Sequence, residues 1–288
     1  MNATNKIAFQ GELGAYSQLA CQNVYPDMEP LPCRTFDDAF AAIRDGKARL
    51  GMIPIENSVA GRVADIHHLM PDSGLHIIGE YFLPVHHHLL GVPEADIADL
   101  THVHSHVHAL NQCRYLIKKL GVTSVVHVDT AGAAIEIAGK GDKSQAVIAS
   151  ELAGKINNLK SLQANIEDAE HNTTRFVVMA QNTIIPAPDS GQLMTTFVFR
   201  VRNVPAALYK AMGGFATNGV NMTKLESYQI GGHFSATQFY ADVEGHPEHR
   251  NVKLALEELG FFTKEVKIIG VYPAHPFRQE NGIVDSED

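Results

Sequence analysis

The sequence contains no tryptophan, few cysteines and fewer basic than acidic residues. Its three cysteines, Cys21, Cys33 and Cys113, are odd in number, far apart and in no CxxC spacing. They are typical of reduced thiols in a reducing compartment. The 23 Lys and Arg residues against 32 Asp and Glu residues give a formal net charge of −9. Because such a chain repels nucleic acids and anionic membranes, and shows no basic stripe, we expect neither as a partner.

Long hydrophobic runs are also missing. No apolar run approaches the ~18 residues that a membrane span needs. Residues 1–8 show no basic stretch followed by an apolar one, so we expect no signal peptide and a cytoplasmic location. The hydrophobic content of 45% is ordinary for a globular protein, and 288 residues suggest two domains.

The first two thirds of the chain alternate between strand and helix patterns. Thr35 and Asp38 form a capping-box pattern that predicts a helix start. Continuous apolar runs are typical of strands buried on both faces. The strands are expected at 6–9, 50–55, 79–92 and 123–128, and the helices from about Ser17, after Thr35, at 108–120 and at 131–139. This alternation predicts an α/β domain with a largely parallel sheet.

Residues 181–193, rich in Pro, Ser and Gly, break this pattern and indicate a linker. The segment after it has the order βαββαβ, which predicts a ferredoxin-like fold. Its elements are expected as a strand near 195–201, a helix from Pro205, a hairpin of 220–228 and 234–243 around Gly231-Gly232, a helix ended by Gly260, and a strand at 263–272.

Several motifs in series resemble the prephenate dehydratase family. KIAFQGELGAYSQLA (6–20) is similar to its opening glycine-rich segment, and GMIPIENSVAG (51–61) to its Ile-Glu-Asn-Ser loop. HSHVHALNQC (104–113) resembles its Ser-His and Gln-Cys segment, and HNTTRFVV (171–178) contains its Thr-Arg-Phe signature. The βαββαβ segment is similar to the ACT domain that binds phenylalanine in this family. The resemblance covers roughly residues 6–278.

The resemblance implies a catalytic domain with two lobes, like a type II periplasmic binding protein, followed by a ferredoxin-like ACT domain. We expect the catalytic domain at 1–182, with lobe 1 at about 1–78 and 165–182 and lobe 2 at about 79–164. A linker at 183–193, an ACT domain at 194–273 and a polar tail at 274–288 follow. Prephenate as the substrate and L-phenylalanine as an allosteric ligand are the expected small molecules. A homodimer or homotetramer is the expected assembly.

The reaction of this family removes water and CO2 from prephenate and leaves phenylpyruvate. Aromatisation drives it, so it needs no cofactor, but the departing hydroxyl needs a proton or hydrogen-bond donor. The resemblance assigns that role to Thr174, while Glu56 would act as an acid if a dry cleft raised its pKa. The residues expected to contact substrate are Asn57, Ser105, Gln112, Thr130, Arg175 and Phe176. Arg175 can bind a carboxylate through two parallel hydrogen bonds, and the helices expected to follow Ser105 and Thr130 can direct N–H groups at carboxylates.

The ACT resemblance lies in NVPAALYKAM (203–212) and KLESY (224–228). The residues expected at the phenylalanine site are Ala206, Ala207, Leu208, Asn221, Glu226 and Ser227. The chain departs from the family pattern at three positions. Ala206 stands where glycine is usual, and Tyr228-Gln229 replace Arg-Pro. These departures leave the affinity and the sign of regulation open.

Three other interpretations remain. The alternating His102, His104, His106 and His108 could bind zinc if they lay on one continuous strand, but a helix is expected to begin near 106–108, and no metal site is expected. A non-catalytic sensor that pairs a solute-binding domain with an ACT domain would have no use for a donor at Thr174. Arogenate dehydratase is the nearer alternative, because arogenate differs from prephenate only in an amine for a keto group.

Overall fold

The computed structural model describes residues 4–169, 171–229 and 238–280. The chain divides into two compact units, Met1–Val63 with Phe82–Phe176, and Ala64–Tyr81 with Val177–Asp288. Two strands, β5 (His76–Pro84) and β11 (Thr173–Ala180), pass from one unit into the other along the chain. Each unit is described separately below.

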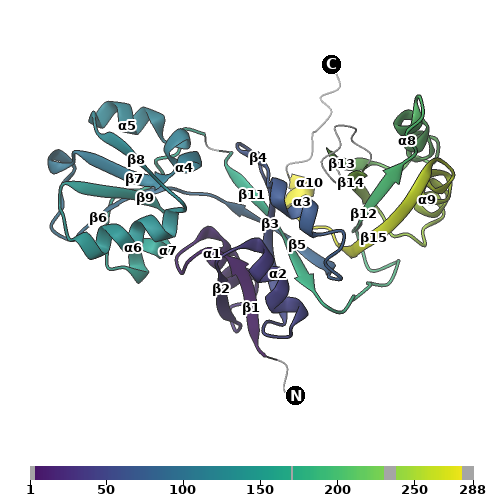
Figure 1. Cartoon of the computed structure of the whole chain (residues 1–288), viewed down its shortest axis with the longest axis horizontal. Coiled ribbons are helices and arrows are strands. Elements are labelled where there is room, and N and C mark those ends of the chain that lie inside the picture. The colour runs from purple at the N-terminus through teal and green to yellow at the C-terminus, as the bar shows by residue number, and fades with distance from the viewer. Residues whose placement is uncertain (1–3, 170, 230–237, 281–288) are drawn as a thin grey trace. The chain divides into compact units, whose positions relative to one another are not determined.

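The first unit begins with alternating strands and helices (Figure 1). They are β1 (Lys6–Gln10), α1 (Tyr16–Val24), β2 (Glu29–Cys33), α2 (Phe36–Arg44), β3 (Leu50–Asn57) and β4 (Gly61–Arg62). β1 lies between β2 and β3 and is parallel to both. The predicted capping box is confirmed: the Asp38 N–H donates to Thr35 Oγ1 at 3.1 Å, and the Thr35 N–H donates to Asp38 Oδ2 at 3.2 Å.

The remainder of the first unit forms a second sheet with helices on both faces (Figure 1). Its elements are β6 (His88–Gly91), the short 3₁₀ helix η1 (Ile97–Asp99), β7 (His102–His106), α4 (Val107–Gln112), α5 (Arg114–Leu120), β8 (Thr123–His127), α6 (Thr130–Lys140), β9 (Gln145–Ala149), α7 (Glu151–Ile156) and β10 (Lys160–Gln163). The strand order is β10-β6-β9-β7-β8, with β7 parallel to β8 and β9. α6 and α7 pack with Leu90 and Val147 on one face, and α4 and α5 pack with Leu89 and Ile148 on the other.

The second unit contains the predicted order βαββαβ, so the α/β fold class is confirmed. Its elements are α3 (Ala64–Leu69), β12 (Leu193–Val201), α8 (Ala207–Thr217), β13 (Met222–Tyr228), β14 (Gln238–Glu244), α9 (Arg250–Phe262), β15 (Thr263–Pro273) and α10 (Phe277–Glu280). The strands follow the order β13-β14-β12-β15 and are antiparallel. The core between this sheet and helices α8 and α9 contains Phe197, Phe199 and Phe239; the Phe199 and Phe239 rings are stacked, and the Phe197 ring is tilted against Phe199.

Several predicted boundaries of the first unit were wrong. The run 79–92 is not one strand, because it contains the end of β5 and all of β6. The helix expected at 108–120 is divided at Cys113 into α4 and α5. The strand at 123–128 is not buried on both faces, because β8 is the edge of its sheet and Val126 is 63% exposed.

Two predictions in the second unit were also wrong. α8 begins at Ala207, because Ala206 has φ 62° and ψ 17°, a left-handed conformation that cannot extend a right-handed helix to Pro205. Gly260 does not end α9, which continues to Phe262. The turn expected at Gly231-Gly232 lies outside the described residues. No helix in the described ranges is long and apolar enough to cross a membrane.

Candidate active site

Thr174 and Asn57 lie together although 117 residues separate them in the sequence. Asn57 is the last residue of β3, and Thr174 is the second residue of β11. The Asn57 side-chain amide donates to Thr174 Oγ1 at 3.0 Å and to Asn172 Oδ1 at 2.8 Å. The structure therefore brings two of the predicted site residues into direct contact.

The loop after β3 holds the Asn57 side chain in place. Asn57 Oδ1 accepts hydrogen bonds from the backbone N–H groups of Val59 at 3.0 Å and Ala60 at 2.7 Å. An Asn side chain that bonds the backbone two residues further on is typical of an Asx turn. The Ile-Glu-Asn-Ser motif therefore leads into a turn that fixes the orientation of the Asn57 side chain.

Glu56 and Arg175 are joined across the same pair of segments. Arg175 Nη1 lies 2.9 Å from Glu56 Oε1, and its guanidinium carbon lies 5.9 Å from the centre of the Phe82 ring. The Arg175 side chain is 3% exposed and that of Glu56 is 32% exposed. A guanidinium this close favours the ionised carboxylate over the protonated carboxyl. The geometry therefore favours Glu56 as the partner of Arg175 over Glu56 as a proton donor.

Gln112, at the end of α4, is connected to Asn57 through Asn172. Asn172 Nδ2 donates to Gln112 Oε1 at 2.9 Å, and Asn172 is 3% exposed. The same Gln112 oxygen lies 2.8 Å from His87 Nε2, and His87 Nδ1 lies 2.7 Å from the Tyr16 hydroxyl. One chain of hydrogen bonds thus connects Thr174, Asn57, Asn172, Gln112, His87 and Tyr16.

Sequence reasoning missed Asn172, His87 and Tyr16. Asn172 directly precedes the Thr-Thr-Arg-Phe run, and His87 is the middle residue of the three-histidine run 86–88. Burial lowers the pKa of His87 and raises that of Tyr16, so both side chains are neutral near pH 7. The proximity of Asn172 to Thr174 in the sequence was the one local signal.

Glu167 holds the histidine run from the other side. Its Oε1 lies 2.8 Å from His86 Nδ1, and its Oε2 accepts from the backbone N–H of His87 at 2.8 Å. Burial acts to raise the pKa of Glu167, but the bonds from His86 and His87 outweigh it, and the pKa is lowered. The segment that carries His87 is therefore anchored by a carboxylate.

Three residues predicted to contact substrate do not join this chain of hydrogen bonds in the described part of the structure: Ser105, Thr130 and Phe176. Ser105 is fully buried, and its hydroxyl donates to the Ile148 carbonyl at 2.6 Å. Thr130 is the first residue of α6, whose N-cap is Asp129. Phe176 is 1% exposed in β11. Their proposed contacts with substrate stay predictions.

The helix expected to begin near 106–108 is confirmed, since α4 begins at Val107; His102, His104 and His106 lie on β7, and His108 lies in α4. His104 Nδ1 lies 2.8 Å from His127 Nε2, and the His106 and His108 rings lie 5.0 Å apart. Across the residues that the structure describes, no three His, Cys, Asp or Glu side chains are grouped to hold a metal ion.

The residues predicted to bind phenylalanine lie on two elements of the second unit. Ala206, Ala207 and Leu208 are at the start of α8, Asn221 precedes β13, and Glu226 and Ser227 lie within β13. A pocket of about 440 Å³ in this unit is lined by other residues, namely Gly191, Gln192, Leu193, Met194, Glu244, Gly245, His249, Ala274, Arg278 and Gln279. The six predicted residues thus stay a prediction.

Tyr228, one of the departures from the family pattern, is built into the second unit. It is 6% exposed, accepts a hydrogen bond from Gln238 Nε2 at 2.7 Å, and packs against the rings of His67 and His68. Burial raises its pKa to about 12. Tyr228 is therefore a packed core residue of this unit.

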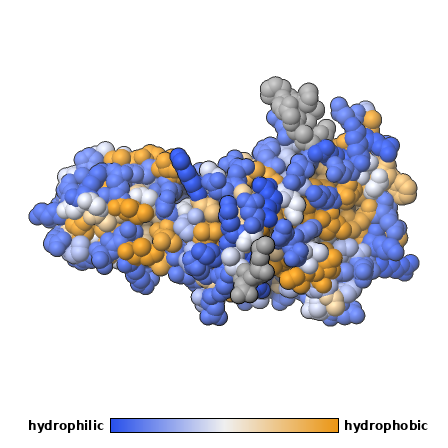
Figure 2. Space-filling view, turned by 60° about the horizontal axis from the view of Figure 1, so that its bottom comes forward, coloured by the Kyte–Doolittle hydropathy of each residue, from blue (hydrophilic) through white to orange (hydrophobic). Residues whose placement is uncertain are grey.

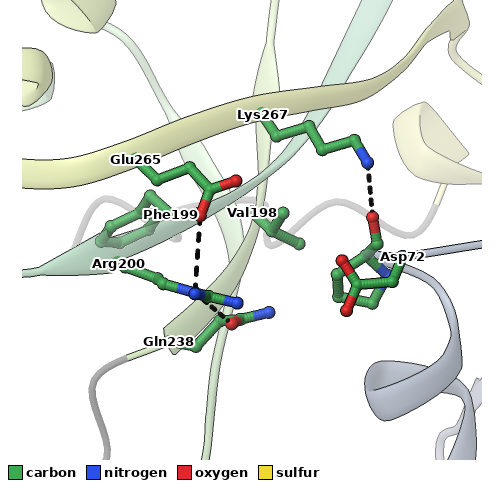
Figure 3. Close-up of a pocket in the computed structure, with 8 residues that line it drawn as sticks. Asp72, Val198, Phe199, Arg200, Gln238, Glu265 and Lys267 are labelled. Atoms are coloured by element: carbon green, nitrogen blue, oxygen red, sulfur yellow. Dashed lines mark hydrogen bonds and ion pairs between the residues drawn. The ribbon is translucent and has the colours of Figure 1, made fainter. Parts of the chain in front are cut away.

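Gln238 also lines a small polar pocket (Figure 3). Arg200 Nε donates to Gln238 Oε1 at 2.8 Å and lies 3.6 Å from Glu265 Oε2, while Lys267 Nζ donates to the Pro71 carbonyl at 2.6 Å. The pocket volume is about 10 Å³. That space admits about one water molecule and excludes an amino acid.

Comparisons with known proteins agree on one family. The model of the family described as prephenate dehydratase matches residues 7–184. A bifunctional N-acyl-homoserine lactone acylase/prephenate dehydratase of Komagataeibacter europaeus is 51% identical over 280 residues, which are 97% of this chain and 100% of that protein. The arogenate dehydratase/prephenate dehydratase 2 of Arabidopsis thaliana is 36% identical over 277 residues, 93% of this chain and 72% of that protein.

Two solved structures are similar over most of the chain. One, described as a novel type of quorum-quenching acylase, has a TM-score of 0.89 and 52% identity, and the match covers 95% of this chain and 99% of the other. The second, a prephenate dehydratase from Arthrobacter aurescens in complex with L-Phe, has a TM-score of 0.85 and 28% identity over 93% of this chain and 90% of the other.

Proposed function

This chain belongs to the prephenate dehydratase family, and we propose that Thr174 donates the hydrogen that lets the ring hydroxyl of prephenate leave as water. The reaction is the conversion of prephenate to phenylpyruvate, water and CO2. The ring C–C bond to the carboxylate breaks, its electron pair enters the ring, and the C–O bond at C4 breaks as the oxygen takes up a proton. One proton is consumed for each turnover.

The observation that carries this proposal is the bond between Asn57 and Thr174. Asn57 Nδ2 donates to Thr174 Oγ1 at 3.0 Å, so the threonine oxygen is the acceptor in that bond. Its own hydrogen can then be donated to a departing hydroxyl. Threonine is a weak acid, and the rate gain must therefore come from position. Arg175 and Gln112 would hold the substrate oxygens beside it.

The test is a direct assay. Purified protein is mixed with prephenate, and phenylpyruvate formation is followed, with arogenate as a parallel substrate. We expect turnover of prephenate. Faster turnover of arogenate would identify an arogenate dehydratase, an activity that the names of several relatives include. Turnover of neither compound, in protein that binds one of them, would support the sensor interpretation.

We further propose that the βαββαβ part of the second unit is an ACT domain that binds L-phenylalanine and regulates the enzyme. The similar Arthrobacter aurescens structure contains L-Phe. Calorimetric titration of the full chain with L-phenylalanine and with D-phenylalanine tests binding. A Glu226→Ala variant distinguishes the predicted site from competition at the active site. It should lose L-phenylalanine binding if the ligand binds at the predicted site, and should keep binding if the ligand competes at the active site.

The proposed assembly is a homodimer or homotetramer in the cytoplasm. Large hydrophobic side chains on the second unit support an interface, since Tyr209 is 82% and Phe261 is 73% exposed. Figure 2 shows hydrophobic surface patches among hydrophilic ones. Light scattering after size-exclusion chromatography measures the mass. A Tyr209→Ser and Phe261→Ser double variant should shift it towards the monomer mass of 31.4 kDa if this surface forms the interface.

A second candidate activity is hydrolysis of N-acyl-homoserine lactones, which the name of the 51% identical relative includes. Amide hydrolysis through a serine needs a neighbouring base. Ser161 Oγ lies 2.9 Å from His88 Nδ1, and burial lowers the pKa of His88, which favours a neutral base. Release of homoserine lactone by the wild type, lost in Ser161→Ala but kept in Thr174→Ala, would establish a separate hydrolytic site.

A further inference from the structure

The hydrogen-bonded chain behind the candidate active site has a direction that starts at Asn57. Backbone N–H groups can only donate, and two of them, from Val59 and Ala60, reach Asn57 Oδ1. The oxygen of this amide must therefore face the turn. Its NH2 group must face Asn172 and Thr174, where the distances are 2.8 and 3.0 Å.

This direction passes to the next amide. Because Asn57 donates to Asn172 Oδ1, the Asn172 NH2 group must point the other way, towards Gln112. Its distance to Gln112 Oε1 is 2.9 Å. The Gln112 amide therefore turns its oxygen inward, and its own NH2 group points away from Asn172.

His87 and Tyr16 continue the same order. Gln112 Oε1 is an acceptor, so His87 Nε2, 2.8 Å away, must carry a hydrogen. His87 Nδ1 then accepts from the Tyr16 hydroxyl at 2.7 Å. Burial lowers the pKa of His87, and the charged or titratable groups near it are Glu167, His86 and His88. A neutral imidazole with its hydrogen on Nε2 satisfies the contacts from Asn57 to Tyr16, and the single Tyr16 hydrogen then goes to His87 Nδ1 at 2.7 Å and not to the His86 carbonyl at 3.0 Å.

We propose that Asn172, His87 and Tyr16 are positioning residues that fix the Gln112 amide, so that Gln112 and Thr174 both meet the substrate as hydrogen donors. The chemical partner of such a pair is an oxygen acceptor, either a carboxylate or a leaving hydroxyl. This inference rests on the proposed function for the identity of the substrate. It goes further in assigning the orientation of Gln112 and the residues that set it.

Asn172→Asp tests the direction of the chain with almost no change in shape. The new carboxylate still accepts from Asn57 but cannot donate to Gln112, so Gln112 must turn its NH2 group inward and present its oxygen to an anionic substrate. We expect KM for prephenate to rise at least about tenfold with a smaller change in kcat. An unchanged KM in this variant would overturn the proposal.

The tautomer of His87 gives a readout that does not depend on turnover. Long-range ¹H–¹⁵N correlation spectra of the full chain should show the hydrogen on Nε2 in the wild type. In Asn172→Asp it should move to Nδ1, because Gln112 then donates to Nε2. Tyr16 can accept this hydrogen, since its hydroxyl also lies 3.0 Å from the His86 carbonyl. A wild-type hydrogen on Nδ1 would contradict the order described.

Substitutions at His87 separate the hydrogen bond from the packing of the ring. His87→Gln keeps an N–H donor and should keep KM within about threefold, whereas His87→Leu should raise KM about tenfold. In a Gln112→Ala background, adding His87→Leu should not raise KM further, since the effect of His87 on KM passes through Gln112. The positioning role would be refuted if His87→Gln and His87→Leu raised KM equally, or if the effects of His87→Leu and Gln112→Ala on KM were additive in the double variant.

His102→Gln is the matched control, because the His102 side chain is exposed and bonds to Thr101 instead. It should leave KM and kcat unchanged. The proposed function and this inference fail in different ways. A wild type that turns over neither prephenate nor arogenate contradicts the function, while the His87 spectra still decide whether the chain has the stated direction.

Discussion

Glu56 and Arg175 form an ion pair, 2.9 Å from Oε1 to Nη1, between neighbouring β3 and β11 residues of the candidate site. A carboxylate held this way is poorly suited to give up a proton, because it carries none. Glu56→Gln, which keeps a hydrogen-bond acceptor for Arg175, should therefore reduce kcat by less than about tenfold. Loss of a general acid would reduce it about 10²–10⁴-fold, and steady-state kinetics distinguish the two.

Thr174→Ala should lower kcat about 10²–10⁴-fold while substrate binding survives, because it removes the proposed donor at the leaving hydroxyl. Thr174→Ser, which keeps the hydroxyl, should recover most of the activity. Thr183→Ala, in the exposed segment after β11, is the matched control and should behave as wild type. Near-normal turnover in Thr174→Ala would contradict the mechanism.

Arg175→Lys should raise KM about tenfold and change kcat less. Lysine keeps the positive charge but loses the planar fork that fits a carboxylate, and it cannot reproduce both the bond to Glu56 and the contact over the Phe82 ring. Arg202→Lys, at an exposed position, serves as the control. If kcat fell and KM stayed constant, Arg175 would act in the transition state instead.

Ala206→Gly should raise the free energy of unfolding by up to about 1 kcal/mol. Ala206 has φ 62°, a left-handed conformation that costs an L-residue about 1–2 kcal/mol and glycine almost nothing, although glycine loses more chain entropy on folding. Ala216→Gly, at an exposed position within α8, should lower it by about 0.5–1 kcal/mol. Urea unfolding of both variants measures the difference, and a lower stability for Ala206→Gly would contradict the argument.

Stability should fall as pH drops below about 6.5. Burial is the main cause that lowers the pKa of five histidines from 6.5: His87, His88, His104, His106 and His275. In the unfolded chain they bind protons near pH 6.5, whereas in the folded chain they bind them only at lower pH. The unfolded chain therefore holds more protons in this window, which favours unfolding.

Urea midpoints at pH 7.5, 6.5 and 5.5 check this pH dependence. We expect a small decrease from pH 7.5 to 6.5, where the unfolded-chain imidazoles are about half protonated, and a larger decrease from pH 6.5 to 5.5. His104→Gln should reduce the drop, because it removes one of the five groups. A midpoint that rises towards pH 5.5 would contradict the expected sign.

Local patterns predicted those parts of the fold that neighbouring residues determine. The Thr35 and Asp38 capping box and the βαββαβ order depend on residues within a few positions of one another, and both are confirmed. The start of α8 depends on a left-handed Ala206, which residue type disfavours, so the pattern placed it two residues early. The edge position of β8 depends on which strands pair, which its own Val residues do not reveal.

The candidate site divides in the same way. Thr174, Asn57 and Gln112 were identified through motifs, and the structure connects them by hydrogen bonds. His87 was not identified, because its role arises from contacts with Gln112, 25 residues away, and with Tyr16, 71 residues away. A histidine run offers no sign of which imidazole turns towards a glutamine. Hydrogen-bond direction is a property of the assembled chain alone.

The burial of all three cysteines has a practical consequence. Cys21, Cys33 and Cys113 are unpaired, and burial raises the pKa of each thiol, that of Cys21 to about 12. Thiolate is the reactive form, so these side chains react slowly with maleimides at neutral pH. Cysteines engineered at exposed positions, one in each unit, would thus accept fluorescent dyes in the native background. Energy transfer between the dyes could then follow the distance between the two units while phenylalanine is added.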